Sequence, residues 1–184
     1  MMEQYHSIKK TLSSDTILFF RLGDFYEMFF DDALRASEIL NITLTGREGG
    51  PVGRVPMCGI PYHSFQQYVR ILLDRNLKVA ICEQIGDPQA AKGLVERKIT
   101  RIVTPATYLD EEAAQSSRPE FLVAVACDRT ACALAALDAG TGEFFVREVG
   151  RERLAGELAL LQPRELILGK GLSPPESLNT AVTV

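Results

Sequence analysis

Residues 19–30 read FFRLGDFYEMFF, and this stretch decides much of the fold because a Gly-Asp pair at 23–24 separates two aromatic-rich segments. A two-residue turn of this kind closes a β-hairpin. Side chains two positions apart leave a strand on the same face, so Phe25 and Glu27 are expected to project together. Tyr26, between them, then points to the opposite face. An apolar ring and a hydrogen-bonding carboxylate would therefore share one side of the second strand.

An aromatic ring beside a carboxylate suits a protein that probes base pairs from the minor groove of DNA. Wedging a ring between base steps costs unstacking energy, and this cost is smallest where the pairing is already faulty. The alternative is that Phe25 is one more core aromatic, because four other phenylalanines surround it in the same stretch. The position of this ring relative to the core therefore separates the two interpretations.

The same stretch resembles the mismatch-recognition domain of the MutS family of DNA repair proteins. Five further motifs continue the similarity in the same order; they are Asp31-Asp32-Ala33, Pro56-Met57, GIPYH at 59–63, CEQIGDP at 82–88 and IVTP at 102–105. The resemblance implies that Phe25 stacks on a mispaired base from the minor groove and that Glu27 hydrogen-bonds this base. A mismatched site kinks at lower cost than a paired duplex, and the wedge converts that difference into affinity.

Glu27 raises an electrostatic question, because DNA phosphates repel a carboxylate that is neither protonated nor hydrogen-bonded. Nearby negative charge raises the pKa of a carboxyl group. We therefore expect Glu27 to bind as a neutral acid or to accept a proton from the displaced base. The alternative interpretation makes Asp24 and Glu27 the two ends of a capping box at a helix start.

Charge is distributed unevenly along the chain. The net charge is -4, but residues 1–104 carry 13 Lys and Arg against 12 Asp and Glu, whereas the remainder has a net charge of -5. The first part is the better DNA-binding candidate, although its near-neutrality predicts few phosphate contacts and weak binding. The candidate phosphate-binding side chains lie in two loops and on the last strand of this part; they are Arg47, Arg54, Lys92, Arg97, Lys98 and Arg101. Of these we favour Arg97, which is expected to share a strand face with Arg101.

A metal-dependent nuclease is a competing interpretation of the acidic residues Asp24, Glu27, Asp31 and Asp32. We disfavour it because the last two suit helix capping and no Lys or His stands at a companion spacing. Asp138 is expected to serve a turn beside Gly140 for a similar reason, since partner carboxylates are missing from the sequence around it.

No phosphate-binding loop of the form G-x-x-x-x-G-K-[ST] is found, because Gly169-Lys170 lacks the upstream glycine and precedes Gly171. We therefore expect no ATP hydrolysis, no enzymatic activity, no cofactor and no metal in this chain. The resemblance implies that ATP and magnesium bind an ATPase domain elsewhere in the longer family proteins.

The composition is ordinary for a soluble globular chain: 184 residues, 46% hydrophobic, with a mean hydropathy of +0.03. We expect no membrane span and no secretory signal, and hence a cytoplasmic protein. Four cysteines, at 58, 82, 127 and 132, form no CxxC pair and lie in apolar surroundings. Buried free thiols are the expected state, with zinc binding or a disulfide as the alternatives.

Periodicity in the first part predicts mixed helices and strands. We expect helices over residues 4–12, over 31–40 with Asp31-Asp32 as its cap, and after Ser64, with His63 in a structural role before the last of them. Strands are expected over residues 43–45, 55–60, 78–85 and 95–104, with a mobile glycine loop over 46–53 and another loop over 86–93. The predicted class is α/β, with a mixed sheet flanked by helices.

A domain linker is expected over residues 105–119, where prolines, acids and serines replace large apolar side chains. Strands are then expected over 121–127, 131–137 and 143–149, followed by a helix through Leu158 and a strand over 165–168. This order resembles the start of the ribonuclease-H-like connector domain of the MutS family. The predicted organisation is a mismatch-recognition domain, residues 1–104, and a partial connector domain, residues 120–184.

The sequence thus predicts a non-catalytic module for mismatched double-stranded DNA. The resemblance implies a homodimer in the longer family proteins and contacts of the connector domain with other repair proteins, but no membrane. The isolated chain is expected to be monomeric or weakly associated and to bind DNA poorly, because it lacks the avidity of the dimeric clamp. The alternatives are the nuclease-like domain and a protein-interaction module that does not bind DNA.

Overall fold

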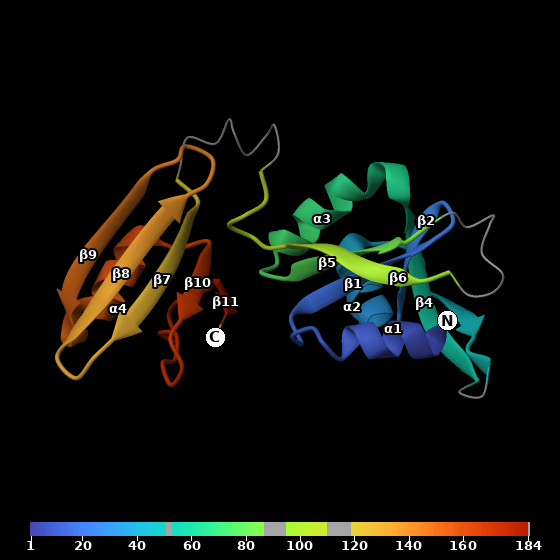
Figure 1. The fold of residues 1–184 in the computed structure, drawn as a ribbon, viewed down its shortest axis with the longest axis horizontal. Coiled ribbons are helices and arrows are strands. Elements are labelled where there is room, and N and C mark those ends of the chain that lie inside the picture. Colours follow the sequence, from blue (N-terminus) through green and yellow to red (C-terminus); the bar gives the residue numbers. More distant parts are fainter. Residues whose placement is uncertain (51–52, 87–94, 110–118, 184) are drawn as a thin grey trace. The chain divides into compact units, whose positions relative to one another are not determined.

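The computed structural model describes residues 1–50, 53–86, 95–109 and 119–183, and the chain divides into two compact units. Unit 1 spans Met1–Val103 and unit 2 spans Thr104–Val184 (Figure 1). Both units combine a mixed sheet with helices, which confirms the predicted α/β class. Within the described residues, no helix is long and apolar enough to cross a membrane. Most of the predicted linker, and the predicted loop that holds Lys92, fall on residues 110–118 and 87–94, outside the described residues.

Unit 1 is built on a six-stranded sheet with the order β3-β4-β2-β1-β5-β6. Its strands are β1 (Thr16–Leu22), β2 (Phe25–Phe29), β3 (Thr45–Glu48), β4 (Arg54–Pro61), β5 (Lys78–Gln84) and β6 (Arg97–Val103). Its helices are α1 (Met2–Lys9), α2 (Phe30–Leu40) and α3 (Phe65–Leu73), the last preceded by the 3-10 turn η2 (Tyr62–Ser64). The predicted helix after Ser64 is confirmed as α3, and the strands predicted over 55–60 and 78–85 are confirmed as β4 and β5.

Strand β1 occupies the middle of this sheet, and its first five residues are buried. It pairs with β2 in the antiparallel and with β5 in the parallel direction. Burial on both faces explains why residues 17–20, ILFF, are continuously apolar instead of alternating. The β1–β2 hairpin is therefore anchored in the centre of unit 1.

Helices cover both faces of the sheet in unit 1, and Figure 1 shows α1 and α3 on opposite sides of it. Tyr5 of α1 packs against Phe20 and Phe29, with ring centroids 5.4 and 5.1 Å apart. On the other face, the Phe65 ring of α3 meets the Tyr26 ring at 5.3 Å. The two faces of strand β2 thus pack against different helices.

The predicted helix cap at Asp31-Asp32 is wrong. Helix α2 begins at Phe30, its N-cap Phe29 makes no side-chain capping bond, and Asp32 is buried at 3% exposure. The Asp32 carboxylate accepts hydrogen bonds from the Leu18 amide at 2.9 Å and the Tyr5 hydroxyl at 3.0 Å, and it pairs with Lys9 at 2.8 Å. Asp32 therefore joins α1, β1 and α2 from inside the protein, because a buried carboxylate needs several partners at once.

Two other boundaries differ from the sequence-based expectation. Helix α1 ends at Lys9 because residues 10–12 close a tighter turn, in which Thr11 and Leu12 donate to the carbonyls of Ile8 and Lys9. Strand β3 lies over residues 45–48, so it begins at the last residue of the predicted strand 43–45 and extends into the predicted glycine loop. It pairs with β4 from Thr45↔Met57 to Glu48↔Arg54. Pairing with an existing edge strand thus orders residues that composition alone assigns to a loop.

Unit 2 contains a five-stranded sheet with the order β11-β10-β7-β8-β9. The elements are β7 (Phe121–Cys127), β8 (Ala131–Asp138), β9 (Phe144–Gly150), the 3-10 turn η4 (Arg151–Arg153), α4 (Leu154–Leu161), β10 (Glu165–Leu168) and β11 (Ala181–Thr183). The predicted antiparallel meander, helix and following strand are confirmed, and β11 is an addition. The core on the α4 side joins Leu158 to Val123, Leu134 and Leu166.

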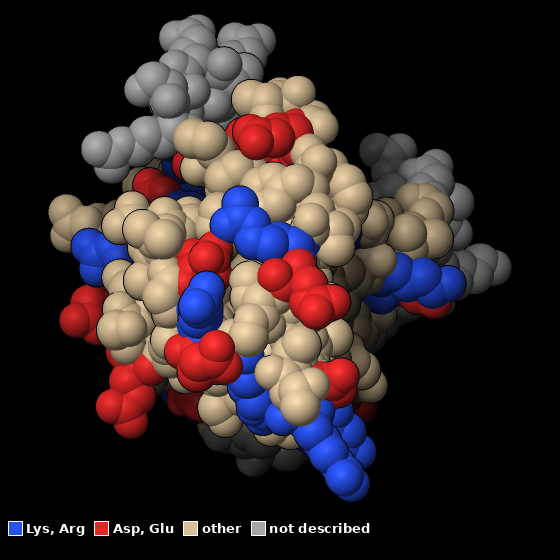
Figure 2. Space-filling view, turned by 90° about the vertical axis from the view of Figure 1, so that its left-hand side faces the viewer, with Lys and Arg blue, Asp and Glu red and all other residues tan. Residues whose placement is uncertain are grey.

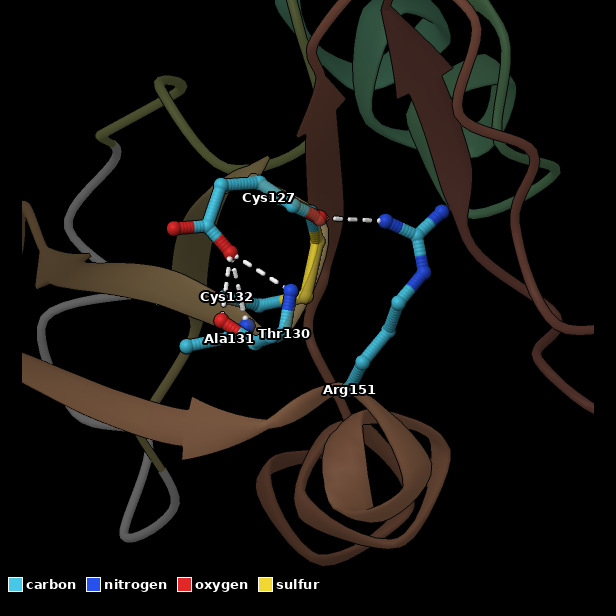
Figure 3. The surroundings of a disulfide bond; sticks show 6 residues. Cys127, Thr130, Ala131, Cys132 and Arg151 are labelled. Atoms are coloured by element: carbon cyan, nitrogen blue, oxygen red, sulfur yellow. Dashed lines mark hydrogen bonds between the residues drawn. A yellow bond between two sulfur atoms is a disulfide. The ribbon is translucent and has the colours of Figure 1, made fainter.

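The four cysteines are in two different states, so the predicted set of free thiols is half wrong. Cys58 and Cys82 in unit 1 are free and buried, as expected. Cys127 and Cys132 form a disulfide across the β7–β8 hairpin (Figure 3). These two residues face each other in the strand register, with Cα atoms 4.0 Å apart. Strand pairing therefore brings together two cysteines that have no disulfide signature in the sequence.

Candidate nucleic-acid interface

The β1–β2 hairpin presents Phe25 to solvent at its turn. Leu22 lies opposite Phe25 in the strand register, and Gly23 has a φ of 58°, a conformation that glycine adopts without strain. The Tyr62 amide donates to the Asp24 carbonyl at 3.0 Å and holds the turn from the adjoining segment. The predicted two-residue hairpin is confirmed.

Phe25 is 47% exposed, whereas Tyr26 and Met28 of the same strand are 2% and 0% exposed. Phe25 and Glu27 therefore share one face of β2, and the alternate residues enter the core, as the two-residue period of a strand requires. The capping-box interpretation of Asp24 and Glu27 is wrong, because Asp24 lies in the turn and Glu27 in the strand. The interpretation of Phe25 as a core residue is also wrong.

Glu27 is held by an ion pair with Arg47. The Arg47 Nη1 atom lies 2.6 Å from Glu27 Oε2, and the two side chains are 40% and 15% exposed. Arg47 belongs to β3, so pairing of β3 with β4 is what carries the guanidinium to the carboxylate. The pair neutralises the charge beside Phe25 and leaves the Arg47 side partly open to solvent.

Gly59 keeps space free beside Glu27. It lies directly opposite Glu27 in the β2–β4 register, and a Cβ atom added at this position would lie 3.5 Å from Glu27 Cγ and 3.4 Å from the Tyr26 carbonyl oxygen. A larger side chain at this position would extend over the same face. The glycine therefore leaves this side of Glu27 without a neighbouring side chain from β4 at that register position.

The other predicted phosphate-binding residues have different surroundings. Arg54, Lys98 and Arg101 are exposed, and Lys98 pairs with Glu96 at 3.1 Å. Lys92 lies outside the described residues. Their role as phosphate contacts stays a prediction, and an exposed pair such as Lys98–Glu96 is only weakly stabilising.

Arg97, the favoured phosphate contact, is buried at 6% exposure. Its guanidinium donates to the Arg21 carbonyl at 2.8 Å, to the Val95 carbonyl at 2.8 Å and to the Gln4 side chain at 3.2 Å. Burial lowers the pKa of Arg97, and the nearby Cys82 and Glu27 oppose this shift. The guanidinium thus ties α1, β1 and β6 together, and we replace the predicted phosphate contact by this structural role.

A β-bulge separates Arg97 from Arg101, so the prediction that they share a strand face is wrong. Cys82 pairs with Ile99, but the preceding Ile81 pairs with Arg101, which leaves Thr100 as the extra residue of β6. One extra residue reverses the side-chain alternation beyond it. Arg97 therefore lies on the face of Phe20, 5.0 Å above its ring, and Arg101 lies on the opposite face.

A polar network on that opposite face is a feature that sequence analysis missed. The Arg21 guanidinium lies 3.5 Å from the centre of the Tyr62 ring and 3.6 Å from the Glu83 carboxylate, and the Tyr26 hydroxyl donates to Glu83. Burial and Glu83 raise the pKa of Tyr26. These groups border a pocket of about 630 Å³ that Arg101 also lines.

This network holds β2 from the side opposite to Phe25. Its members come from three of the motifs that carried the family resemblance, namely residues 19–30, 59–63 and 82–88. A sequence signal was therefore present, but nothing in the spacing shows that the three motifs meet. Anchoring Tyr26 restricts the rotation of the strand and so helps to direct Phe25 outward.

The carboxylates proposed for a two-metal site are not assembled into one. Among residues 1–50, 53–86, 95–109 and 119–183, no group of three or more His, Cys, Asp or Glu could hold a metal ion. Asp32 is committed to Lys9, and Asp138 accepts the Gly140 amide at 2.8 Å in a turn, as predicted. The nuclease alternative is therefore not favoured.

Unit 2 offers a poorer surface for a phosphate backbone. Figure 2 looks onto its β9 side, where acidic and basic side chains are interspersed over the middle of the face. Arg147 and Glu157 of this unit form an ion pair, with Arg147 Nη1 2.6 Å from Glu157 Oε2. Together with the net charge of -5 beyond residue 104, this places the DNA candidate in unit 1.

Unit 1 is thus an α/β domain that carries an exposed aromatic ring beside a carboxylate–arginine pair. Residues 1–112 match the sequence family of MutS domain I, and residues 120–184 match that of MutS domain II. The chain therefore belongs to the MutS family of DNA mismatch repair proteins, in which domain I is the mismatch-recognition domain.

Curated relatives agree with this assignment. The DNA mismatch repair protein MutS of Syntrophomonas wolfei is 48% identical over 172 residues, and that of Myxococcus xanthus is 49% identical over 172 residues. The protein of the same name from Listeria welshimeri is 46% identical over 173 residues. These matches cover 91%, 93% and 92% of this chain but only 20%, 19% and 20% of the relatives. The chain therefore spans about a fifth of the relatives that it matches.

Proposed function

We propose that this chain senses mispaired bases in double-stranded DNA, with Phe25 as the wedge and Glu27 as the hydrogen-bonding group. The observation that carries the proposal is the 47% exposure of Phe25 in a strand whose neighbouring residues are buried. Single exposed rings are common on protein surfaces, and what distinguishes Phe25 is that it shares its strand face with the Glu27–Arg47 pair. A faulty base step is a suitable partner for this face, since it opens at low cost.

The Glu27–Arg47 pair gives the wedge its polar part. Insertion of Phe25 brings both side chains to the minor groove edge of the displaced base, where Arg47 faces the phosphate side and Glu27 the base. Arg47 compensates the carboxylate on approach to the negative backbone. Glu27 then accepts a hydrogen bond from the base, or donates one as a neutral acid.

Backbone contacts come from the exposed cations of unit 1. Arg54, Lys98 and Arg101 are the described candidates. Their number is small, so the chain by itself binds DNA weakly and with a shallow dependence on salt. In the longer proteins of this family, we propose that dimerisation supplies avidity, that ATP and magnesium act in another domain, and that unit 2 contacts other repair proteins.

The test compares Phe25→Ala with a matched control, Phe144→Ala. Phe144 of unit 2 is an equally large ring and is 62% exposed, but it lies outside the proposed interface. Binding of a short duplex with one central G·T pair, and of its perfectly paired counterpart, is measured by fluorescence anisotropy at low salt. Phe25→Ala should bring the affinity ratio of the two duplexes close to one, and Phe144→Ala should leave it unchanged.

Avidity can be restored by placing residues 1–184 in the Myxococcus xanthus relative, in exchange for its matching segment. The same two substitutions are then compared in that chimaera. An unchanged ratio after Phe25→Ala in both settings would overturn the proposal and favour a protein-interaction module. Magnesium-dependent cleavage of the duplex would favour the nuclease class instead.

A further inference from the structure

The disulfide of unit 2 closes the end of the β7–β8 hairpin. The Asp128 amide donates to the Ala131 carbonyl at 2.9 Å, so Arg129 and Thr130 form a two-residue turn just beyond the disulfide. The next register pair is Cys127↔Cys132. In the cytoplasm predicted from the sequence, disulfides are rare, and those that persist there usually take part in redox chemistry.

The two cysteines of the disulfide differ in burial, since Cys127 is partly buried and Cys132 is fully buried. Cys127 lines a pocket of about 240 Å³ together with Arg151, Leu154 and Leu158. Cys132 is 1% exposed and packs in the core of unit 2. A thiol that attacks a disulfide must approach one sulfur from the side away from the other. Of the two cysteines, Cys127 lines this pocket and Cys132 does not.

The pocket that Cys127 lines also contains a cation. Arg151 lines the same pocket and donates from Nη1 to the Asp128 carbonyl at 2.6 Å, which holds its side chain across the end of the hairpin (Figure 3). The Asp128 carboxylate is occupied by the Thr130 and Ala131 amides at 2.7 and 2.8 Å. Positive charge near a sulfur favours its thiolate and attracts anionic thiols.

We propose that Cys127 is a thiol–disulfide exchange site for an anionic low-molecular-weight thiol such as glutathione. The proposal is independent of mismatch sensing, since every group it uses lies in unit 2. The pocket beside α4 would bind a small thiol that has carboxylate groups. Arg151 would bind a carboxylate of this thiol while the thiol sulfur contacts Cys127.

The exchange conserves atoms and electrons in two steps. The thiolate of the small thiol forms a bond to Cys127 Sγ, the Cys127–Cys132 bond breaks, and its electron pair passes to Cys132 Sγ, which takes up a proton. A second small thiol then attacks the mixed disulfide and releases Cys127 as a thiol and the symmetric small disulfide as product. The small thiol is the reductant, and the reverse sequence with the small disulfide as oxidant restores the cross-link.

The free cysteines of unit 1 provide an internal control. Burial raises the pKa of Cys58 to about 12 and that of Cys82 to about 11. Such thiols are almost fully protonated at neutral pH and react slowly. Adducts of the native protein should therefore appear at Cys127 and not at Cys58 or Cys82.

The first measurement is the number of free thiols in the purified chain. Alkylation in denaturant without reductant, followed by intact mass analysis, should label two of the four cysteines, and peptide mapping should place the labels on Cys58 and Cys82. Labelling of Cys127 and Cys132 in protein kept in air would overturn the proposal at this step.

The second measurement separates the two sulfurs. Cys132→Ser leaves Cys127 at the pocket, and oxidised glutathione should form one adduct there. Of the disulfide pair, Cys127→Ser leaves the buried Cys132. Its adduct should form at least about tenfold more slowly than the adduct at Cys127. Comparable rates would overturn the proposal. Circular dichroism confirms that each variant is folded, and acid-quenched mapping of the mixed disulfide in the wild-type chain gives the same assignment without any substitution.

The third measurement tests the role of charge. Arg151→Gln should slow the reaction of Cys132→Ser protein with oxidised glutathione several-fold, while its reaction with the neutral hydroxyethyl disulfide stays unchanged. Equal slowing with both reagents would show a steric effect and would overturn the assignment of an anionic thiol.

Discussion

The two units each contain a β-hairpin with a two-residue turn, and the two hairpins are stabilised in opposite ways. In β1–β2 the turn depends on a backbone conformation, because Gly23 has a positive φ. In β7–β8 neither turn residue has a positive φ, and the Asp128 side chain supplies the missing hydrogen bonds to Thr130 and Ala131. The same motif can thus be closed by backbone freedom or by side-chain capping.

The residues next to the two turns also differ in what they do. Beside the first turn, Phe25 is exposed and is free to contact a partner. Beside the second, Cys127 is covalently joined to the opposite strand. Both hairpins include central strands of their sheets and both turns reach solvent, so the difference lies in the residue beside the turn: an exposed ring in unit 1 and a cross-linked cysteine in unit 2.

The largest expected effect is a difference in the free energy of unfolding between substitutions of the buried and the exposed ring of the first hairpin. Phe20 is fully buried between Tyr5 and Arg97, so Phe20→Ala should lower the free energy of unfolding of unit 1 by about 3–5 kcal/mol. Phe25→Ala should change it by no more than about 0.5 kcal/mol, as expected for an exposed site. Urea unfolding followed by tyrosine fluorescence measures both, since four of the five tyrosines lie in unit 1. Similar losses for both variants would contradict the assignment of Phe25 to the surface.

The second prediction concerns the cross-link of the other hairpin. Residues 127–132 form a short closed loop, and opening it should lower the free energy of unfolding of unit 2 by about 2 kcal/mol through the entropy of the unfolded chain. Hydrogen exchange of the β7–β8 amides, followed by mass spectrometry with and without reductant, measures this loss. The Cys127→Ser, Cys132→Ser double variant should show the same faster exchange without reductant, and unit 1 should be unaffected in every case.

A third substitution sharpens the functional side of the comparison. Glu27→Gln should keep or tighten DNA binding, because it removes a charge that phosphates repel, and should lower the preference for a G·T duplex by roughly tenfold, or about 1.4 kcal/mol. Arg47→Gln is the matched control, since it breaks the same ion pair but retains the carboxylate and should weaken binding to both duplexes. If Glu27→Gln abolished all DNA binding at neutral pH, the proposed role of the carboxyl group would be wrong.

The smallest expected effect is a pH dependence of the second turn. Amides of Ala131 and Thr130 donate to the Asp128 carboxylate and hold its pKa below the ordinary value of 3.8. A depressed pKa contributes stability that is present above about pH 4 and is lost as the pH falls through the folded-state value. Asp128→Asn keeps an acceptor oxygen, so exchange at β7–β8 should become less sensitive to pH between about 4 and 2 in this variant. Equal pH dependence of both proteins would contradict this contribution.

Much of the fold was predictable because local patterns dominate it. The β1–β2 hairpin, helix α3 and the meander β7–β9 follow from turn residues and from apolar periods of two and 3.6. The outward direction of Phe25 followed from the same alternation. These features depend on neighbours within a few positions in the chain, so a single sequence contains the information.

The errors arose where distant residues meet. Asp32 was predicted to be a helix cap, but it is buried, where it pairs with Lys9 and accepts a hydrogen bond from Tyr5. Arg97 looked like a surface cation, but it is buried beneath α1, and the bulge at Thr100 moves Arg101 to the other face. Charge and spacing in the sequence do not show which of several polar residues will find buried partners.

The amino-acid sequence by itself determined the family, the order of helices and strands, and the pairing of an exposed ring with a carboxylate on one strand face. These follow from composition, turn chemistry and the side-chain period of a strand. Only the tertiary structure decided that Arg47 holds Glu27, that Arg97 is structural and that Cys127 is joined to Cys132. Each of these contacts depends on the register between strands, and register is set by the packing of the whole sheet.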